Sequence, residues 1–192
     1  MNEVGVVVWG GRGEQTLAED ARREGYPVRI ADPSVPWPVT LLLSWGAQTP
    51  WGLVDVSRLL VQTWEMAVPL WHYGKTANDV GDEEERAATR DIVRDLRVPL
   101  HSVEFVVVRQ GHIGQTFVET WKEEMGRFPA GDRRLAFLRA FYRIKPRLCA
   151  LPAAWVLGTS LLVEGVPRRR PTIGLLEARR RRQEAILTGK KV

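Results

Sequence analysis

The sequence predicts an α/β fold built on one mixed, mostly parallel sheet, and three observations support this prediction. The run Val4–Trp9 is apolar throughout and ends in two glycines, which is typical of a strand buried on both faces of a parallel sheet. Strand and helix patterns then alternate along the chain, as they do in α/β domains. Apolar residues make up 44% and charged residues 27% of the 192 residues, which suits one domain with a sizeable core.

The first half of the chain alternates short apolar runs with amphipathic segments. After the strand Val4–Trp9, a helix is predicted over Gln15–Glu24, because Leu17, Ala18 and Ala21 share one face and Gly25 can end it. The elements predicted next are the strands Pro27–Ala31 and Val39–Ser44, a helix over Val54–Glu65 and a strand over Val68–Tyr73. The polar, glycine-containing stretch Gly74–Glu85 predicts a loop.

The second half predicts a helix over Glu83–Leu96, a strand over Phe105–Val108 and two further helices. The first of these helices contains Phe117, Val118 and Trp121, and the second, Arg133–Tyr142, follows a Gly-Asp turn. The apolar run Gly158–Gly165 predicts a last strand, and Leu175–Leu187 predicts an exposed helix. We therefore expect an α/β domain over residues 1–166 and a basic, helical C-terminal extension over residues 167–192.

The net charge of +5 is unevenly distributed along the chain. Residues 166–192 contain nine Lys and Arg but only two Glu, whereas the other 165 residues contain 19 basic and 21 acidic side chains. Any affinity for a polyanion or a protein partner is therefore expected in the segment Arg168–Arg182. A terminus that only keeps the protein soluble is the alternative.

Cysteine, histidine and hydropathy exclude several classes of protein. The one cysteine, Cys149, excludes an intrachain disulfide and a multi-cysteine metal site, and it fits an inert thiol in a reducing, cytoplasmic setting. The three histidines, His72, His101 and His112, do not have metal-ligand spacing. No apolar run reaches the roughly 18 residues that a membrane span needs, so we expect none.

The glycines after the first strand form part of a phosphate-binding pattern. Gly10 and Gly11 precede a helix, whose first N–H groups could meet a phosphate. Thr16 stands where the third glycine of the dinucleotide fingerprint would be, which disfavours a dinucleotide site. Asp32, at the end of the second predicted strand, either binds ribose hydroxyls or forms a turn with Pro33.

The segment Leu100–Trp155 contains a characteristic order of features. An apolar strand precedes a helix with Trp121, a Gly131-Asp132 turn and a further helix follow, and the segment closes on Leu-Pro-x-x-Trp. This order resembles the second half of a nucleotide-diphospho-sugar glycosyltransferase domain of the GT-A type, and residues 4–45 resemble its first half more loosely. The resemblance implies one Rossmann-like, GT-A-like domain that transfers a sugar from a nucleotide diphosphate donor to an acceptor hydroxyl.

The resemblance also implies roles for single residues. Those expected to border the nucleotide sugar are Trp9, Gly10, Gly11 and Asp32, with Lys75 at the diphosphate and Trp155 as a wall or stacking floor. Asp132 and Glu104 are expected on the acceptor side, where a carboxylate can orient or deprotonate a hydroxyl. The alternatives are a solvated Lys75, a helix N-cap at Asp132 and a Glu104 that points to solvent.

The Asp-x-Asp pair that holds Mn or Mg in metal-dependent members of this family does not occur in the sequence. The nearest arrangement is Asp79-Val80-Gly81-Asp82, whose carboxylates could share a hard cation. Three glutamates follow directly, so these acids equally fit the first turn of a helix, where the helix dipole favours negative charge. A metal-independent or non-catalytic relative is consistent with the same pattern.

Two other functions compete with the glycosyltransferase. A binding or assembly protein on a GT-A-like scaffold would lack donor affinity and would dock a partner through the tail. A nucleic-acid-associated protein would depend on the arginines of residues 167–192, and its binding would weaken steeply with salt.

Overall fold

A computed structural model describes residues 4–10, 13–44, 61–71 and 75–151. The chain divides into two units, Met1–Ser160 and Leu161–Val192, and every described residue belongs to the first. Most of the predicted helix over 54–65, the predicted strand over 158–165 and the basic extension therefore lie outside the described residues.

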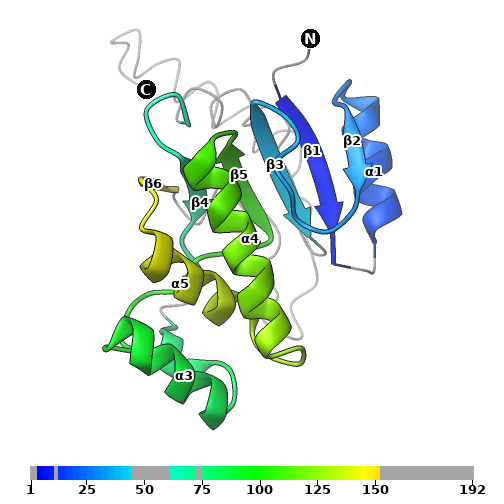
Figure 1. Cartoon of the computed structure of the whole chain (residues 1–192). Helices are drawn as coiled ribbons and strands as arrows, with labels where there is room; N and C mark the ends of the chain where they lie inside the picture. The colour runs from blue at the N-terminus through cyan, green and yellow to red at the C-terminus, as the bar shows by residue number, and fades with distance from the viewer. Residues whose placement is uncertain (1–3, 11–12, 45–60, 72–74, 152–192) are drawn as a thin grey trace, which may run out of the picture. The chain divides into compact units, whose positions relative to one another are not determined.

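Six strands form one mixed sheet in the order β2-β1-β3-β5-β4-β6. Their bounds are Val4–Trp9 (β1), Val28–Ile30 (β2), Val39–Ser44 (β3), Met66–Pro69 (β4), Phe105–Arg109 (β5) and Leu148–Leu151 (β6). Three pairings, β1 with β2, β1 with β3 and β4 with β6, are parallel, and β5 runs antiparallel to both of its neighbours. The prediction of an α/β fold with a mixed, mostly parallel sheet is therefore confirmed (Figure 1).

Four α-helices accompany the sheet in the described part of the chain: α1 (Glu14–Arg23), α3 (Glu83–Val93), α4 (His112–Arg127) and α5 (Arg133–Ile144). Each of α3 and α5 begins at an aspartate, Asp82 or Asp132, whose side chain accepts a hydrogen bond from a backbone N–H of the first turn. No described helix is long and apolar enough to cross a bilayer.

Alternating residues of the strands supply two hydrophobic cores, one on each face of the sheet. Val6 and Val8 of β1 pack with Ala18 and Ala21 of α1, whereas Val7 and Trp9 belong to the opposite core. That second core also contains the buried aromatic residues of α4 and α5, namely Phe117, Trp121 and Phe137. Helix α4 lies in front of β5 in Figure 1, and α3 packs on α5 away from the sheet.

The described elements differ from the prediction mainly in the middle and at the end of the sheet. Strand β4 begins at Met66, two residues before the predicted start. It ends at Pro69, whose nitrogen has no hydrogen to donate to a neighbouring strand. The predicted loop over 74–85 contains one turn of 3-10 helix, Ala77–Asp79. Strand β6 was not predicted, because four residues are too few to show a pattern.

Candidate functional site

The connections between the strands change direction at β1. The chain passes from β1 through α1 to β2 on one side, and then returns across β1 to β3 on its other side. In open α/β sheets, ligands bind outside the carboxyl ends of the strands at such a switch point. Trp9 and Ser44, the last residues of β1 and β3, are direct partners there, and Ser44 N–H donates to the carbonyl of Glu104 at 3.0 Å.

A cleft of about 390 Å³ opens at this edge of the sheet. Its lining comes from the carboxyl ends of β1 and β2, the last turns of α4 and the first turn of α5. The polar and aromatic residues in that lining are Trp9, Asp32, Lys122, Phe128, Asp132 and Arg133. Trp9, Gly10, Asp32 and Asp132 had been selected from the sequence, so the fold brings together residues that are up to 123 positions apart.

Trp9, Gly10 and Arg133 form the contact between the sheet and α5. The Arg133 guanidinium carbon lies 4.8 Å from the centre of the Trp9 ring, and Arg133 Nη2 donates a long hydrogen bond, 3.4 Å, to the Gly10 carbonyl. Gly10 has a φ of 100°, and a Cβ there would lie 2.7 Å from Arg133 Nη1. The backbone conformation therefore favours a glycine at this position, and a larger residue would also displace the tip of the Arg133 side chain.

The indole N–H of Trp9 has no hydrogen-bond acceptor among the described residues. Its side chain is only 5% exposed and packs edge-on against Trp121, with ring centres 5.2 Å apart. Trp121 Nε1 donates to the backbone carbonyl of Arg133 at 3.3 Å, whereas the buried Trp9 Nε1 finds no acceptor among the described residues. Buried indole N–H groups normally have a partner, so this unpaired donor is an exception within the core beside the cleft.

Asp132 is the N-cap of α5, as the alternative interpretation of this residue predicted. Its carboxylate accepts from the backbone N–H of Arg134 at 2.9 Å and forms a bidentate pair with the Arg134 guanidinium at 2.8 and 2.5 Å. Arg134 in turn stacks on Trp71 with its guanidinium carbon 3.7 Å from the ring centre. Because its charge is already compensated, Asp132 is poorly suited to removing a proton from an acceptor.

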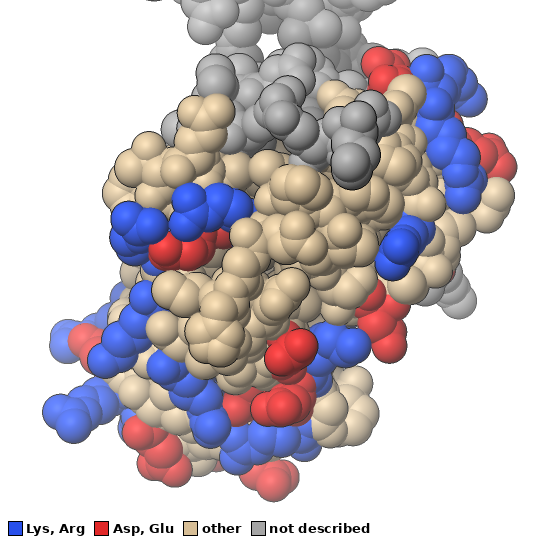
Figure 2. Space-filling model, turned by 45° about the horizontal axis from the view of Figure 1, so that its top comes forward, with Lys and Arg blue, Asp and Glu red and all other residues tan. Residues whose placement is uncertain are grey.

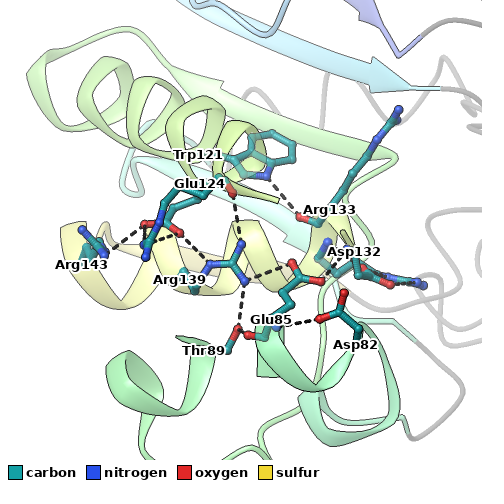
Figure 3. A network of polar contacts seen from close by, with 11 residues as sticks. Asp82, Glu85, Thr89, Trp121, Glu124, Asp132, Arg133, Arg139 and Arg143 are labelled. Carbon is teal, nitrogen blue, oxygen red and sulfur yellow. Dashed lines mark hydrogen bonds and ion pairs between the residues drawn. The ribbon is translucent and has the colours of Figure 1, made fainter. Parts of the chain in front are cut away.

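A buried ion network holds the turn before α5 in place (Figure 3). Arg139 on α5 is fully buried and reaches Glu85 on α3 at 3.1 Å and Glu124 on α4 at 2.7 Å. The second oxygen of Glu85 accepts the backbone N–H of Asp132 at 2.8 Å. The network therefore ties three helices together and fixes where α5 begins, which sets the place of Arg133 at the cleft.

A second, smaller cleft of about 240 Å³ lies against the same turn and is lined by Ser44, Glu104 and Arg134 among others. Glu104 is half-buried, and its Oε2 accepts a hydrogen bond from Ser102 Oγ at 2.5 Å. Gly131, Asp132 and Arg133 line both clefts. Glu104 thus faces a cavity that adjoins the main cleft, where a carboxylate can meet an acceptor.

Lys75 does not line either cleft. It is exposed, and its Nζ lies 5.5 Å from the centre of the Trp71 ring. Predicted site residues Gly11 and Trp155 lie outside the described residues. Cys149 is half-buried and packs against the core on the face of the sheet that α1 covers.

Asp79 and Asp82 have structural partners of their own. The Asp79 carboxylate accepts from Thr76 N at 2.7 Å and from Thr76 Oγ1 at 2.8 Å, and these bonds hold its pKa below the usual range. Asp82 Oδ1 accepts from Glu85 N at 2.8 Å as the N-cap of α3. In the described part of the chain no three acidic, histidine or cysteine side chains gather in a group that could hold a metal ion.

Acidic and basic side chains lie next to one another on the face of the molecule that Figure 2 shows. Ion pairs bring such charges together, for example Glu65 with both Arg109 and Arg147, where hydrogen bonds from Arg147 lower the pKa of Glu65. The segment Arg168–Arg182, to which the sequence assigns polyanion binding, lies outside the described residues.

Comparison of the sequence with models of known protein families and with curated proteins finds no match. The arguments for function therefore come from the site itself. The sequence analysis had not selected Lys122 and Arg133, the two basic residues of the main cleft. The adjacency of Arg133 to Asp132 was the one available signal, since a residue next to a predicted cleft residue can share the cleft.

Proposed function

We propose that the chain is a glycosyltransferase-like protein that binds a nucleotide sugar in the main cleft and transfers the sugar to an acceptor hydroxyl. One observation carries the proposal: the cleft at the switch point joins Trp9, Gly10 and Asp32 to the turn at Asp132. These are residues that a resemblance to GT-A glycosyltransferases selected in two separate halves of the sequence. The mixed sheet, with its single reversed strand β5, is compatible with a Rossmann-like, GT-A-like domain.

The ends of the cleft suit the two ends of a nucleotide sugar. The exposed Asp32 carboxylate, just after β2, can accept hydrogen bonds from ribose hydroxyls, as acids at the ends of such strands do. Trp9 offers an aromatic wall. A volume of about 390 Å³ is within the range of small-ligand sites.

Transfer needs a base on the acceptor side, and Glu104 meets that need better than Asp132. The acceptor oxygen would attack the anomeric carbon as its proton passes to the Glu104 carboxylate. The bond from that carbon to the diphosphate oxygen would break, and the nucleoside diphosphate would leave with the bonding electrons. The Glu104 carboxylate accepts a hydrogen bond only from Ser102 among the described residues, whereas the Asp132 carboxylate is paired with Arg134.

Calorimetric titration of the purified chain with nucleotide sugars and nucleoside diphosphates tests donor binding. We expect one nucleotide to bind, and Asp32→Asn to weaken it about tenfold or more, since hydrogen bonds to charged groups contribute about 1.5–3 kcal/mol. Asp91→Asn is the matched control, because Asp91 is an exposed acid on α3 outside both clefts. The absence of binding by any nucleotide would refute the donor assignment.

A non-catalytic binding protein on the same scaffold is the second candidate. The observation in its favour is that the carboxylates of Asp79, Asp82 and Asp132 all serve as helix caps. Release of free sugar from a bound donor, measured in wild type and in Glu104→Gln, separates the two candidates. Turnover that Glu104→Gln abolishes supports the enzyme, and donor binding without any turnover supports the binding protein.

A further inference from the structure

The main cleft contains two basic side chains whose charge no described acid compensates. Lys122, on α4, and Arg133, the first residue of α5, both line the cleft and are exposed. Neither forms an ion pair with a carboxylate of the described residues. Basic side chains that line one cleft and form no ion pair can bind an anion, and two of them suit a ligand with two negative groups.

Many other arginines of the described residues are already paired with acids. Those with carboxylate partners are Arg109, Arg127, Arg134, Arg139, Arg143 and Arg147. The contrast with Arg133 is sharpest for Arg134, its neighbour in sequence, which forms two hydrogen bonds to Asp132. Arg133 is the arginine of this turn that remains available to a ligand.

The position of Arg133 is defined although its guanidinium is available. Trp121 Nε1 holds its backbone carbonyl, the Trp9 ring supports its guanidinium, and the glycine at position 10 leaves room for it. The one hydrogen bond that its guanidinium donates to the described residues is the long one to the Gly10 carbonyl. Exchanging that bond for bonds to a phosphate costs little, because a guanidinium has five N–H donors and a charged oxygen is the stronger acceptor.

We propose that Lys122 and Arg133 form the diphosphate subsite of this cleft and neutralise the leaving nucleoside diphosphate in place of a metal ion. This inference rests on the proposed function for its ligand. Neutralising the diphosphate was expected of Lys75, or of a cation bound by Asp79 and Asp82, and the proposal assigns this role to two residues that line the cleft instead. The charges of the cleft suit that ligand: Asp132 is neutralised by Arg134, which leaves one acid, Asp32, for hydroxyls and two bases for the diphosphate.

The test is calorimetric titration of the full chain in EDTA with three probes: a nucleoside diphosphate, its nucleoside and inorganic pyrophosphate. Arg133→Gln and Lys122→Gln should each weaken the nucleoside diphosphate and pyrophosphate about tenfold to a hundredfold and leave the nucleoside unchanged. Arg97→Gln is the control, because Arg97 is exposed and lies outside both clefts. Thermal melting of each variant verifies that it is folded.

The outcomes separate this inference from the proposed function. If a nucleoside diphosphate binds and neither variant weakens it, or if it binds only when Mn or Mg is added, the diphosphate subsite is overturned and the proposed function stands. If pyrophosphate binds and Arg133→Gln removes it, but no nucleotide binds better, the anion subsite stands and the proposed function fails. If no probe binds, both are refuted.

Discussion

Replacement of Arg139 by methionine should destabilise the protein strongly, because it removes the centre of the buried ion network. Arg139, Glu85 and Glu124 are exposed by 0%, 1% and 2%. Methionine approximates the length of the arginine stem, so the loss of the charge and of its hydrogen bonds dominates the effect.

The structure indicates which of the two glutamates would lose its charged partner. Glu124 keeps two arginines after the change, Arg127 at 3.1 Å and Arg143 at 3.2 Å. Glu85 loses its charged partner and keeps the N–H of Asp132 as its remaining side-chain hydrogen bond among the described residues. Removal of one partner from a buried pair typically costs about 3–5 kcal/mol, and we expect a loss of that size in the free energy of unfolding.

Urea denaturation followed by tryptophan fluorescence measures the loss. The double variant Arg139→Met/Glu85→Gln should be more stable than the sum of its single changes by about 1–3 kcal/mol, since it no longer buries an unpaired carboxylate. Arg97→Met, at an exposed pair with Asp95, should change stability little. A loss below about 1 kcal/mol for Arg139→Met, or strict additivity in the double variant, would refute the reasoning.

Three further predictions concern stability. Burial lowers the pKa of His101 from 6.5 to about 4, so the stability that the neutral imidazole contributes is present above pH 6.5 and is lost as the pH falls toward 4. The free energy of unfolding should decrease by about 3 kcal/mol over that range, and His101→Leu should remove this part of the pH dependence. Gly5→Ala should cost about 1–3 kcal/mol in thermal melts, because the new Cβ would lie 2.1 Å from Trp37 Cδ2. At Gly126 a new Cβ meets nothing within 4 Å, so Gly126→Ala should stabilise helix α4 by up to about 1 kcal/mol. Equal effects at the two glycines would contradict the packing argument. Asp82→Ala should cost about 1 kcal/mol in the same melts through loss of the α3 cap, and Asp82→Asn, which keeps the acceptor, should cost less.

The parts of the fold that could be predicted are those in which local sequence and burial agree. β1 and β3 have the predicted bounds because both their faces are buried, so every residue is apolar or small and turn residues flank the run. The N-cap at Asp132 could be predicted because capping depends on a few neighbouring residues. Strand β6 could not, because Leu148–Leu151 becomes a strand only by pairing with β4, from which it is some 80 residues distant in the chain.

The candidate site divides in the same way. Trp9 ends strand β1, and Gly10 and Asp32 come just after strands, so their position at the carboxyl edge follows from parallel topology alone. Arg133 and Lys122 were missed because their place depends on how α4 and α5 pack on the sheet. Lys75, which a glycine-adjacent loop suggested for the diphosphate, instead lies by Trp71, because the capping box of Thr76 and Asp79 fixes the turn that follows it.

The sequence by itself determined the α/β class and the strand that opens the sheet, and it offered the cap that starts α5 as one of two roles for Asp132, since these depend on apolar runs and on hydrogen bonds between near neighbours. Only the tertiary structure decided which charges are available to a ligand. Asp132, Arg133 and Arg134 are consecutive in the chain. Asp132 and Arg134 form an ion pair with each other, whereas Arg133 lies over Trp9 at the cleft. The physical reason is that charge compensation depends on distances between elements, and those distances are set by the Arg139 network and the packing of the helices on the sheet.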